Sequence, residues 1–366
     1  MPDSRHRASI WYKLHIDFPL LFGLLALMGT SLVVLYSAGG ADIALMQRQL
    51  LRMALALAVM FILAQVSPSL YRKWAFPIFV IGTIMLVAVL IFGHVGKGAQ
   101  RWLDLGFTKF QPSEIMKVVM PLAIARYMSN QPIPPSFRTI CVAFLMVIVP
   151  TLLIAKQPDL GTSLLVATSG IFVIFLAGMS WYLVVIAFGL ISAFAPILWF
   201  FLMHPYQKQR VLTFLNPERD PLGSGYHIIQ SKIAIGSGGF WGKGWLSGTQ
   251  SQLDFLPERH TDFIFAVFGE EFGLFGVILL LALYLFVICR CLMIALQGQR
   301  AFESLVAGSI TLTFFIYLFV NIGMVSGLLP VVGVPLPLIS YGGTSMVTLM
   351  AGFGILMSVR THRRLS

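Results

Sequence analysis

The chain has 366 residues, of which 58% are hydrophobic and 11% are charged, and its formal net charge is +11. Many apolar runs reach the roughly 20 residues that cross a bilayer as a helix. This composition excludes a water-soluble enzyme and predicts an all-α polytopic membrane protein. The positive charge indicates anionic lipid headgroups as its counterpart, and not nucleic acid, because no nucleic-acid-binding motif accompanies it.

The apolar runs predict about ten transmembrane helices within a single membrane domain, residues 1–366. With boundaries good to about 2–4 residues, the predicted helices cover residues 18–38, 49–66, 74–93, 114–128, 138–155, 161–178, 182–203, 262–289, 304–328 and 345–359. Residues 204–261, between the seventh and eighth helices, form the one long loop.

Charged residues are distributed unevenly over the loops. Basic residues such as Arg5, Arg72 and Arg363 gather on the face that carries both termini, and the positive-inside rule makes that face cytoplasmic. Most acidic residues fall on the other face, several of them at helix ends. Charge at bilayer depth is costly and marks a polar cavity, so we expect the functional site and the long loop on the extracytoplasmic side.

The stretch from Leu256 to Val267 passes from a polar loop directly into an apolar helix, and Asp262 is its last charged residue. A carboxylate that is desolvated on one side has a raised pKa, which suits it to accept a proton near neutral pH. We therefore predict that Asp262 is the catalytic base of a membrane enzyme with a lipid-linked substrate. His260 is expected to position this loop more than to exchange a proton.

Other polar residues near helix ends are candidates to line the same cavity. Glu114 and Lys117 are three residues apart and share a helix face. They form a local ion pair, part of a substrate cavity, or both. Arg101, in an outer loop, is either a headgroup contact or a diphosphate ligand, and its neighbour Trp102 is either an anchor at the membrane interface or a substrate contact. Asp159 is well placed to cap the following helix, which would be sufficient to explain it.

The long loop contains two patterned stretches. Residues 226–235 have apolar residues at helical spacing and predict a helix lying along the membrane surface. The glycine-rich run from Gly236 to Trp245 either holds phosphate through backbone N–H groups or is a flexible turn with two interfacial tryptophans. Arg210 and Lys243 are the candidate diphosphate ligands of this loop.

The connection 327–345 is apolar, yet its prolines and glycines deny it an unbroken helix. Non-helical backbone at membrane depth persists only where protein or a wet cavity satisfies it. We expect this connection to fold back into the bundle and to shape the site, with Ser340 as a candidate substrate contact. Glu270 and Glu271, inside the eighth predicted helix, are either partners of another helix or a proton route.

Two long motifs resemble those of one family of membrane proteins. The first is the pattern Asn321-x5-Gly327-Leu328-x-Pro330-x2-Gly333, then Pro335-x-Pro337 and Ser340-x-Gly342-Gly343-x-Ser345. The second is the block Pro257-Glu258-x-His260-Thr261-Asp262-Phe263-Ile264-Phe265-Ala266. Both are similar to signatures of the SEDS family (shape, elongation, division and sporulation), and the resemblance runs from the first helix to the last. The segments 99–104 and 236–239 favour its rod-shape-determining branch over its division branch.

The resemblance implies a peptidoglycan glycosyltransferase in the bacterial cytoplasmic (inner) membrane, with its active site on the outer face. Its substrate would be lipid II, a disaccharide-pentapeptide on undecaprenyl diphosphate, polymerised during cell elongation. The family's essential aspartate corresponds to Asp262, and its acid and base on the fourth helix correspond to Glu114 and Lys117. The implied partners are membrane lipid, a class B penicillin-binding transpeptidase and the elongation proteins MreB, MreC, MreD and RodZ.

The implied reaction forms a β-1,4 bond from an α-linked donor. Inversion at the donor carbon needs a base on the acceptor hydroxyl, which we assign to Asp262. The leaving diphosphate needs positive charge from among Arg101, Lys117, Arg210 and Lys243, and a divalent cation (Mg or Mn) is able to assist. No paired-aspartate metal motif is present, so no metal ligand set is predicted.

Two other classes of protein fit part of the pattern. Broken helices and buried ion pairs also describe a lipid II flippase or another transporter. A scaffold that only holds the transpeptidase is the third class. The concentration of acidic residues on one face favours the enzyme, because a transporter needs a charged path open to each face in turn.

Overall fold

The computed structural model describes residues 14–96, 99–104, 109–203, 205–216, 224–253, 255–256 and 258–362. The long helices are α2 (Phe18–Ala38), α3 (Ile43–Gln65), α4 (Pro68–Phe92), α5 (Pro112–Met128), α6 (Phe137–Lys156), α7 (Leu160–Leu176), α8 (Trp181–Ile197), α12 (Ile264–Leu296), α13 (Ala301–Val325) and α14 (Thr344–Thr361). A π-helical turn, Leu198–Leu202, follows α8, and the shorter helices are α9 (Pro205–Leu215), α10 (Ser224–Ser237) and α11 (Thr249–Gln252).

The described helices confirm a multi-pass helical membrane protein. Seven of them are long and apolar enough to cross a membrane, namely α2, α3, α4, α6, α12, α13 and α14. Helices α5, α7 and α8 stand at the other three predicted positions and have 17 residues each. At 1.5 Å per residue, that length is about 26 Å, slightly less than the roughly 30 Å of a bilayer core. The count of ten crossings stays a prediction.

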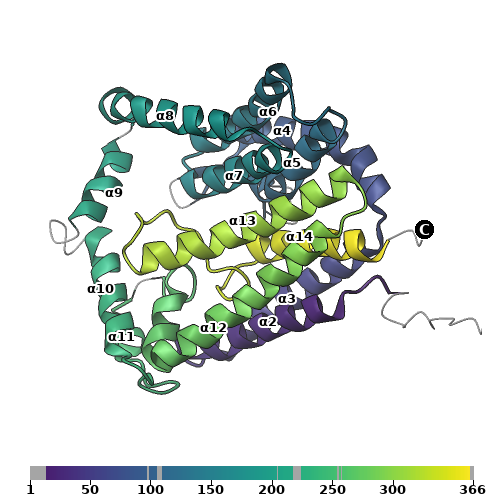
Figure 1. Cartoon of the computed structure of the whole chain (residues 1–366). Coiled ribbons are helices and arrows are strands. Elements are labelled where there is room, and N and C mark those ends of the chain that lie inside the picture. Colours follow the sequence, from purple (N-terminus) through teal and green to yellow (C-terminus); the bar gives the residue numbers. More distant parts are fainter. Residues whose placement is uncertain are drawn as a thin grey trace, which may run out of the picture.

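Helices α13 and α14 lie at the centre of the bundle (Figure 1). Helix α13 packs against α5, α7 and α12, and α14 packs most extensively against α3. Helices α4 to α7 form one group beside this centre, and α2, α3 and α12 form the other (Figure 1). The aromatic side chains of Phe314, Tyr317 and Phe353 are fully buried where these groups meet. Helix α13 is therefore the element against which helices of both groups pack.

The two ends of the described chain meet at one end of the bundle. The His15 ring stacks on His362 with a centroid distance of 3.9 Å. Asp17 caps α2 by accepting the backbone N–H of Leu20 at 3.0 Å. The same carboxylate accepts two hydrogen bonds from the Arg290 guanidinium, at 2.7 and 2.9 Å. Helices α9 to α11 lie at the opposite end (Figure 1).

The segment before α5 corrects the all-α prediction. It forms a small antiparallel sheet of β1 (His94–Gly96), β2 (Ala99–Asp104) and β3 (Lys109–Phe110), in the order β1-β2-β3. The sheet pairs backbone groups that would otherwise need other partners. Strands of two to six residues carry too little period-two pattern to be recognised from sequence. The chain is therefore mostly helical, with one short sheet.

Helix α12 is broken, whereas the sequence predicted one continuous span. Gly273 has φ 64° and ψ −167°, which interrupts the helix. The backbone N–H groups of Leu274 and Phe275 donate to loop carbonyls of the glycine-rich run, both at 3.0 Å. In return, the N–H groups of Lys243 and Gly244 donate to the carbonyls of Glu270 and Glu271, again at 3.0 Å. The loop thus satisfies the groups that the break exposes.

This arrangement corrects both interpretations of the glycine-rich run. Its N–H groups at Gly242, Lys243 and Gly244 are bonded to backbone carbonyls, so they do not form a phosphate cradle. The same bonds fix the run against α12, so it is not a flexible turn. The helix predicted at residues 226–235 is present as α10, but Ile228, Ser231 and Ala234 are buried. Helix α10 packs against α12 and α13, so that face is covered by protein.

We expect Gly273→Ala to destabilise the protein. A Cβ at this position would lie 2.3 Å from the Gly242 nitrogen and 2.7 Å from the Phe240 oxygen, and the φ of 64° is strained for alanine. Strain and overpacking of this kind cost about 1–3 kcal/mol each. Thermal unfolding in detergent measures the effect. Gly29→Ala in α2 is the control, because its Cβ would meet nothing within 4 Å. Equal melting temperatures for the two variants would contradict the account of the break.

Candidate active site

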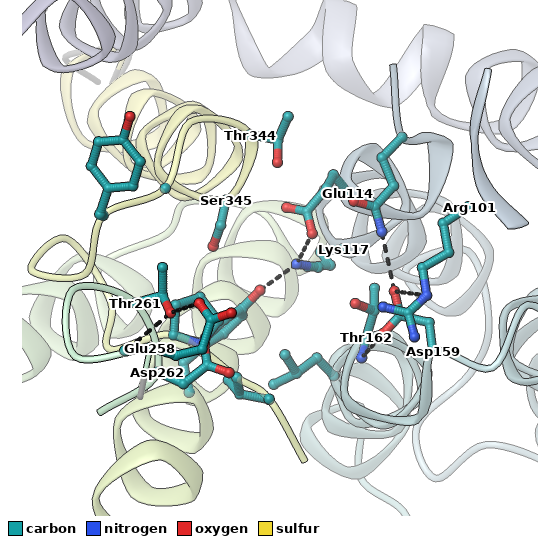
Figure 2. Close-up of a pocket in the computed structure, with 18 residues that line it drawn as sticks. Arg101, Glu114, Lys117, Asp159, Thr162, Glu258, Thr261, Asp262, Thr344 and Ser345 are labelled. Carbon is teal, nitrogen blue, oxygen red and sulfur yellow. Dashed lines mark hydrogen bonds and ion pairs between the residues drawn. The ribbon is translucent and has the colours of Figure 1, made fainter. Parts of the chain in front are cut away.

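A cavity of about 370 Å³ lies where several separate segments meet. Its lining comes from β2, the first turns of α5 and α7, the segment before α12, helix α13, the connection 326–343 and the start of α14. Figure 2 shows Glu114 and Lys117 in its middle, Arg101 and Asp159 on one side, and Asp262 on the other. The cavity thus brings together five of the predicted site residues.

The pair predicted from helical spacing is present in the first turns of α5. Lys117 Nζ lies 2.5 Å from Glu114 Oε1, and the two residues are only 9% and 7% exposed. Lys117 also donates to the Tyr317 hydroxyl, and Thr348 donates to Glu114 Oε2 at 3.1 Å. Both residues line the cavity. The Glu114–Lys117 ion pair therefore forms part of the cavity wall. The Lys117 ammonium is more buried there than the Arg101 guanidinium.

Asp159 has two roles in the geometry. Its Oδ1 accepts the backbone N–H of Thr162 at 3.2 Å and caps α7. Its Oδ2 accepts the Gln111 amide at 3.1 Å and lies 3.9 Å from Arg101 Nε. Arg101 also donates to the carbonyls of Gln157, at 3.3 Å, and Pro158. Capping alone does not account for Asp159, because its side chain also holds a guanidinium at the cavity wall.

Asp262 lies in the turn before α12 and is half-buried at the cavity wall. Its backbone carbonyl accepts the Asn321 side-chain amide at 2.9 Å. The connection 326–343 passes beside the carboxylate, since a Cβ on Gly333 would lie 3.4 Å from Asp262 Oδ2. The prediction that this connection folds back into the bundle is confirmed. The carboxylate therefore stands at a water-accessible hollow, not in solid helix packing.

Three predicted site residues are not brought to the cavity, and the side chain of a fourth lies outside the described residues. Among the described residues, the lining does not include Trp102, Ser340 or Lys243. The Ser340 hydroxyl donates to the Thr261 carbonyl at 2.5 Å, so it serves the backbone. Lys243 Nζ lies 2.7 Å from Glu270 Oε1 at the break in α12. Arg210 belongs to α9, and its side chain lies outside the described residues.

The two acidic residues within α12 are held by neighbouring elements. Glu270 accepts from Lys243 and also from the Thr249 hydroxyl at 3.1 Å and the Gln250 N–H at 3.0 Å. Glu271 accepts from the Ser37 hydroxyl of α2. These contacts favour the interpretation that Glu270 and Glu271 join α12 to neighbouring elements over the interpretation that they form a proton route.

The sequence interpretation missed several residues around the site. Glu258 lines the cavity and accepts the Thr261 hydroxyl at 3.0 Å. Tyr317 lines it from α13, where a tyrosine within an apolar helix gave no signal. Arg52, in α3, stacks over the ring of the lining residue Tyr341 at 4.3 Å. An arginine inside a predicted span was a signal that could have identified Arg52.

Two carboxylates on one wall of this cavity are the candidates to hold a divalent cation. No group of three or more His, Cys, Asp or Glu residues is clustered within the part of the chain that the structure describes. Glu258 and Asp262 nevertheless line the same side of the hollow (Figure 2). Magnesium is commonly held by one or two carboxylates together with the phosphates of a substrate. Glu258 and Asp262 are thus the residues of this wall that would hold such an ion.

Comparison with known proteins identifies the family. The model FTSW_RODA_SPOVE, described as a cell cycle protein, matches residues 11–365. The chain belongs to the FtsW/RodA/SpoVE family. This is the SEDS family that the two motifs indicated, so that prediction is confirmed.

The relatives agree with the predicted branch. The peptidoglycan glycosyltransferase MrdB of Escherichia coli K12 is 57% identical over 365 residues, covering 100% of this chain and 99% of MrdB. The probable peptidoglycan glycosyltransferase FtsW of Trichlorobacter lovleyi is 35% identical, covering 96% and 94% of the two chains. The higher identity to MrdB than to this FtsW is consistent with the rod-shape-determining branch.

Solved structures share the fold. A chain of a peptidoglycan synthase complex that coordinates polymerization and crosslinking matches with a TM-score of 0.84 and 34% identity, covering 96% of this chain and 99% of that one. The rod shape determining protein RodA of Thermus thermophilus matches with a TM-score of 0.73 and 28% identity, covering 96% and 98%.

Proposed function

We propose that this chain is a peptidoglycan glycosyltransferase that polymerises lipid II during cell elongation, with Asp262 as its general base. One observation carries the proposal: a half-buried carboxylate and a buried, fixed ammonium line the same cavity. A sugar transfer from diphosphate needs both groups, one to remove a proton and one to accept negative charge.

In this mechanism the acceptor sugar lies against the wall of Glu258 and Asp262. Asp262 takes the proton of the 4-hydroxyl of N-acetylglucosamine while that oxygen attacks the anomeric carbon of the donor. The new C–O bond forms as the bond to diphosphate breaks on the opposite side, so the configuration inverts. The proton stays on Asp262 until it passes to water.

The opposite wall suits the leaving group. Lys117 and Arg101 place positive charge on the lining, and both are held by partners that fix their orientation. Preorganised charge stabilises a developing anion without reorganising at the moment of reaction.

We place the protein in the bacterial inner membrane, with ten crossings, cytoplasmic termini and an extracytoplasmic cavity. The meeting of His15 with His362 supports an even number of crossings. The position of α9 to α11 at the other end supports a long loop on the opposite face (Figure 1). The synthase complex among the structural matches supports a class B penicillin-binding transpeptidase as a partner. The similarity to the rod-shape-determining branch supports a role in the elongation machinery of MreB, MreC, MreD and RodZ.

A polymerisation assay tests the function. The purified full-length chain, alone and with a class B transpeptidase, is incubated with lipid II in detergent, where no membrane gradient exists. We expect glycan strands that a gel resolves by length. Absence of glycan in both arms, together with movement of fluorescent lipid II across proteoliposomes, would contradict the proposal and identify the transporter.

A further inference from the structure

The turn that carries Asp262 is held from outside. Helix α12 has no side-chain cap at its start. Three consecutive carbonyls before it instead accept hydrogen bonds from other segments. The His260 carbonyl accepts the Tyr341 N–H at 2.7 Å, the Thr261 carbonyl accepts the Ser340 hydroxyl at 2.5 Å, and the Asp262 carbonyl accepts the Asn321 amide at 2.9 Å. We call Asn321, Ser340 and Tyr341 the carbonyl clamp.

The two side chains that act in the clamp, those of Asn321 and Ser340, are themselves fixed. The Asn321 amide, which is fully buried in α13, also donates to the Val334 carbonyl at 2.7 Å. The Ser340 hydroxyl, 4% exposed, accepts the Leu336 N–H at 2.7 Å. Both side chains therefore tie the Asp262 turn to the connection 326–343. Neither residue lines the cavity among the described residues, so neither is placed to touch the substrate.

The same connection limits where the carboxylate can go. Gly333 has φ 73°, and its missing Cβ would lie 3.4 Å from Asp262 Oδ2. The clamp fixes the backbone of the turn that carries the Asp262 carboxylate. The backbone of Gly333 lies close to one oxygen of that carboxylate. A displaced turn would therefore change the reach of the carboxylate into the cavity.

We propose that Asn321 and Ser340 are positioning residues that hold the Asp262 carboxylate at the distance needed to deprotonate the acceptor. This inference rests on the proposed function. Misplacement of a reacting group by about 1 Å can lower a rate by about 100-fold. Asn321 and Ser340 do not line the cavity, so we expect their loss to lower turnover much more than substrate affinity.

The first test compares steady-state polymerisation of lipid II by Ser340→Ala, Ser340→Thr and Ser326→Ala in the full chain. We expect Ser340→Ala to lower kcat by about 10- to 100-fold with KM within about twofold. Ser340→Thr keeps the hydroxyl and should recover most of the rate. Ser326→Ala is the matched control, because its hydroxyl donates at 2.7 Å to the Ile322 carbonyl, four residues earlier in the chain, and, in the described part of the chain, makes no contact with the Asp262 turn. A raised KM with normal kcat would overturn the proposal.

The second test asks whether the clamp acts through Asp262. In the Asp262→Asn background, Ser340→Ala and Asn321→Asp should lower the residual rate no further, because there is no base left to position. Multiplicative losses would overturn the proposal while leaving the function intact. A fully active Asp262→Asn would instead overturn the proposed function. If Ser340→Ala does not fold, Ser340→Cys, a weaker donor of similar size, replaces it, and a normal kcat in that folded variant would overturn the proposal.

Discussion

Asp262→Asn should lower the rate of glycan polymerisation by about 10²- to 10⁴-fold, the usual contribution of a general base. The amide has nearly the same shape as the carboxylate but cannot accept the proton of the acceptor hydroxyl. Binding of lipid II and of the transpeptidase should persist, because the clamp holds the backbone of this turn independently of the side chain. The rate with purified lipid II measures the loss.

Asp42→Asn is the matched control for this substitution. Asp42 caps α3 by accepting the Ala44 N–H at 2.8 Å, and asparagine caps helices about as well as aspartate. This control should keep the normal rate. Full activity of Asp262→Asn would show that the base is another group. Loss of glycan synthesis in a variant that still forms the complex with the transpeptidase would exclude the alternative that the chain is only a scaffold.

Lys117→Met should both destabilise the protein and strongly slow polymerisation. It leaves Glu114 buried, 7% exposed, without its cation. Breaking a buried ion pair by removing one partner typically costs about 3–5 kcal/mol. It also removes a positive charge from the wall that we assign to the diphosphate, which lowers rates by about 10²- to 10³-fold in comparable sites. Thermal unfolding and the polymerisation rate report the two effects separately.

The double variant Glu114→Gln/Lys117→Met separates a structural pair from a catalytic one. It removes both charges, so most of the stability should return. The polymerisation rate should stay low, because the diphosphate still lacks its ammonium. Recovery of both stability and rate would mean that the pair only balances charge within the bundle. Lys243→Met is the cation control: it also leaves a buried acid, Glu270, without its cation, but Lys243 does not line the cavity, so the folded variant should retain a normal chemical step.

The sequence allowed good prediction where one physical signal dominates. Long apolar runs placed the helices, and the 18–38 prediction matches α2. The spacing of Glu114 and Lys117 predicted their contact, because residues three apart on a helix must share a face. Asp262 was found because it is the last charge before an apolar run. Each of these signals is local, so it needs no knowledge of tertiary structure.

The remaining features depend on contacts between distant segments. The break at Gly273 forms because the loop near Gly242 supplies hydrogen bonds from about thirty residues away along the chain. Ser340 was predicted to contact substrate, but its hydroxyl donates its hydrogen bond to the Thr261 carbonyl. Lys243 was predicted to bind diphosphate, but it pairs with Glu270. A polar residue shows its chemistry in the sequence, but not which partner the fold provides.

The most direct measurement is a structure of Asp262→Asn, in complex with its transpeptidase, with donor and acceptor lipid II analogues bound. We expect the substituted side chain to lie within about 2.6–3.2 Å of the acceptor 4-hydroxyl, and the donor diphosphate to lie on the wall of Lys117 and Arg101. An acceptor hydroxyl held against a different carboxylate, or a diphosphate bound outside this cavity, would contradict this expectation.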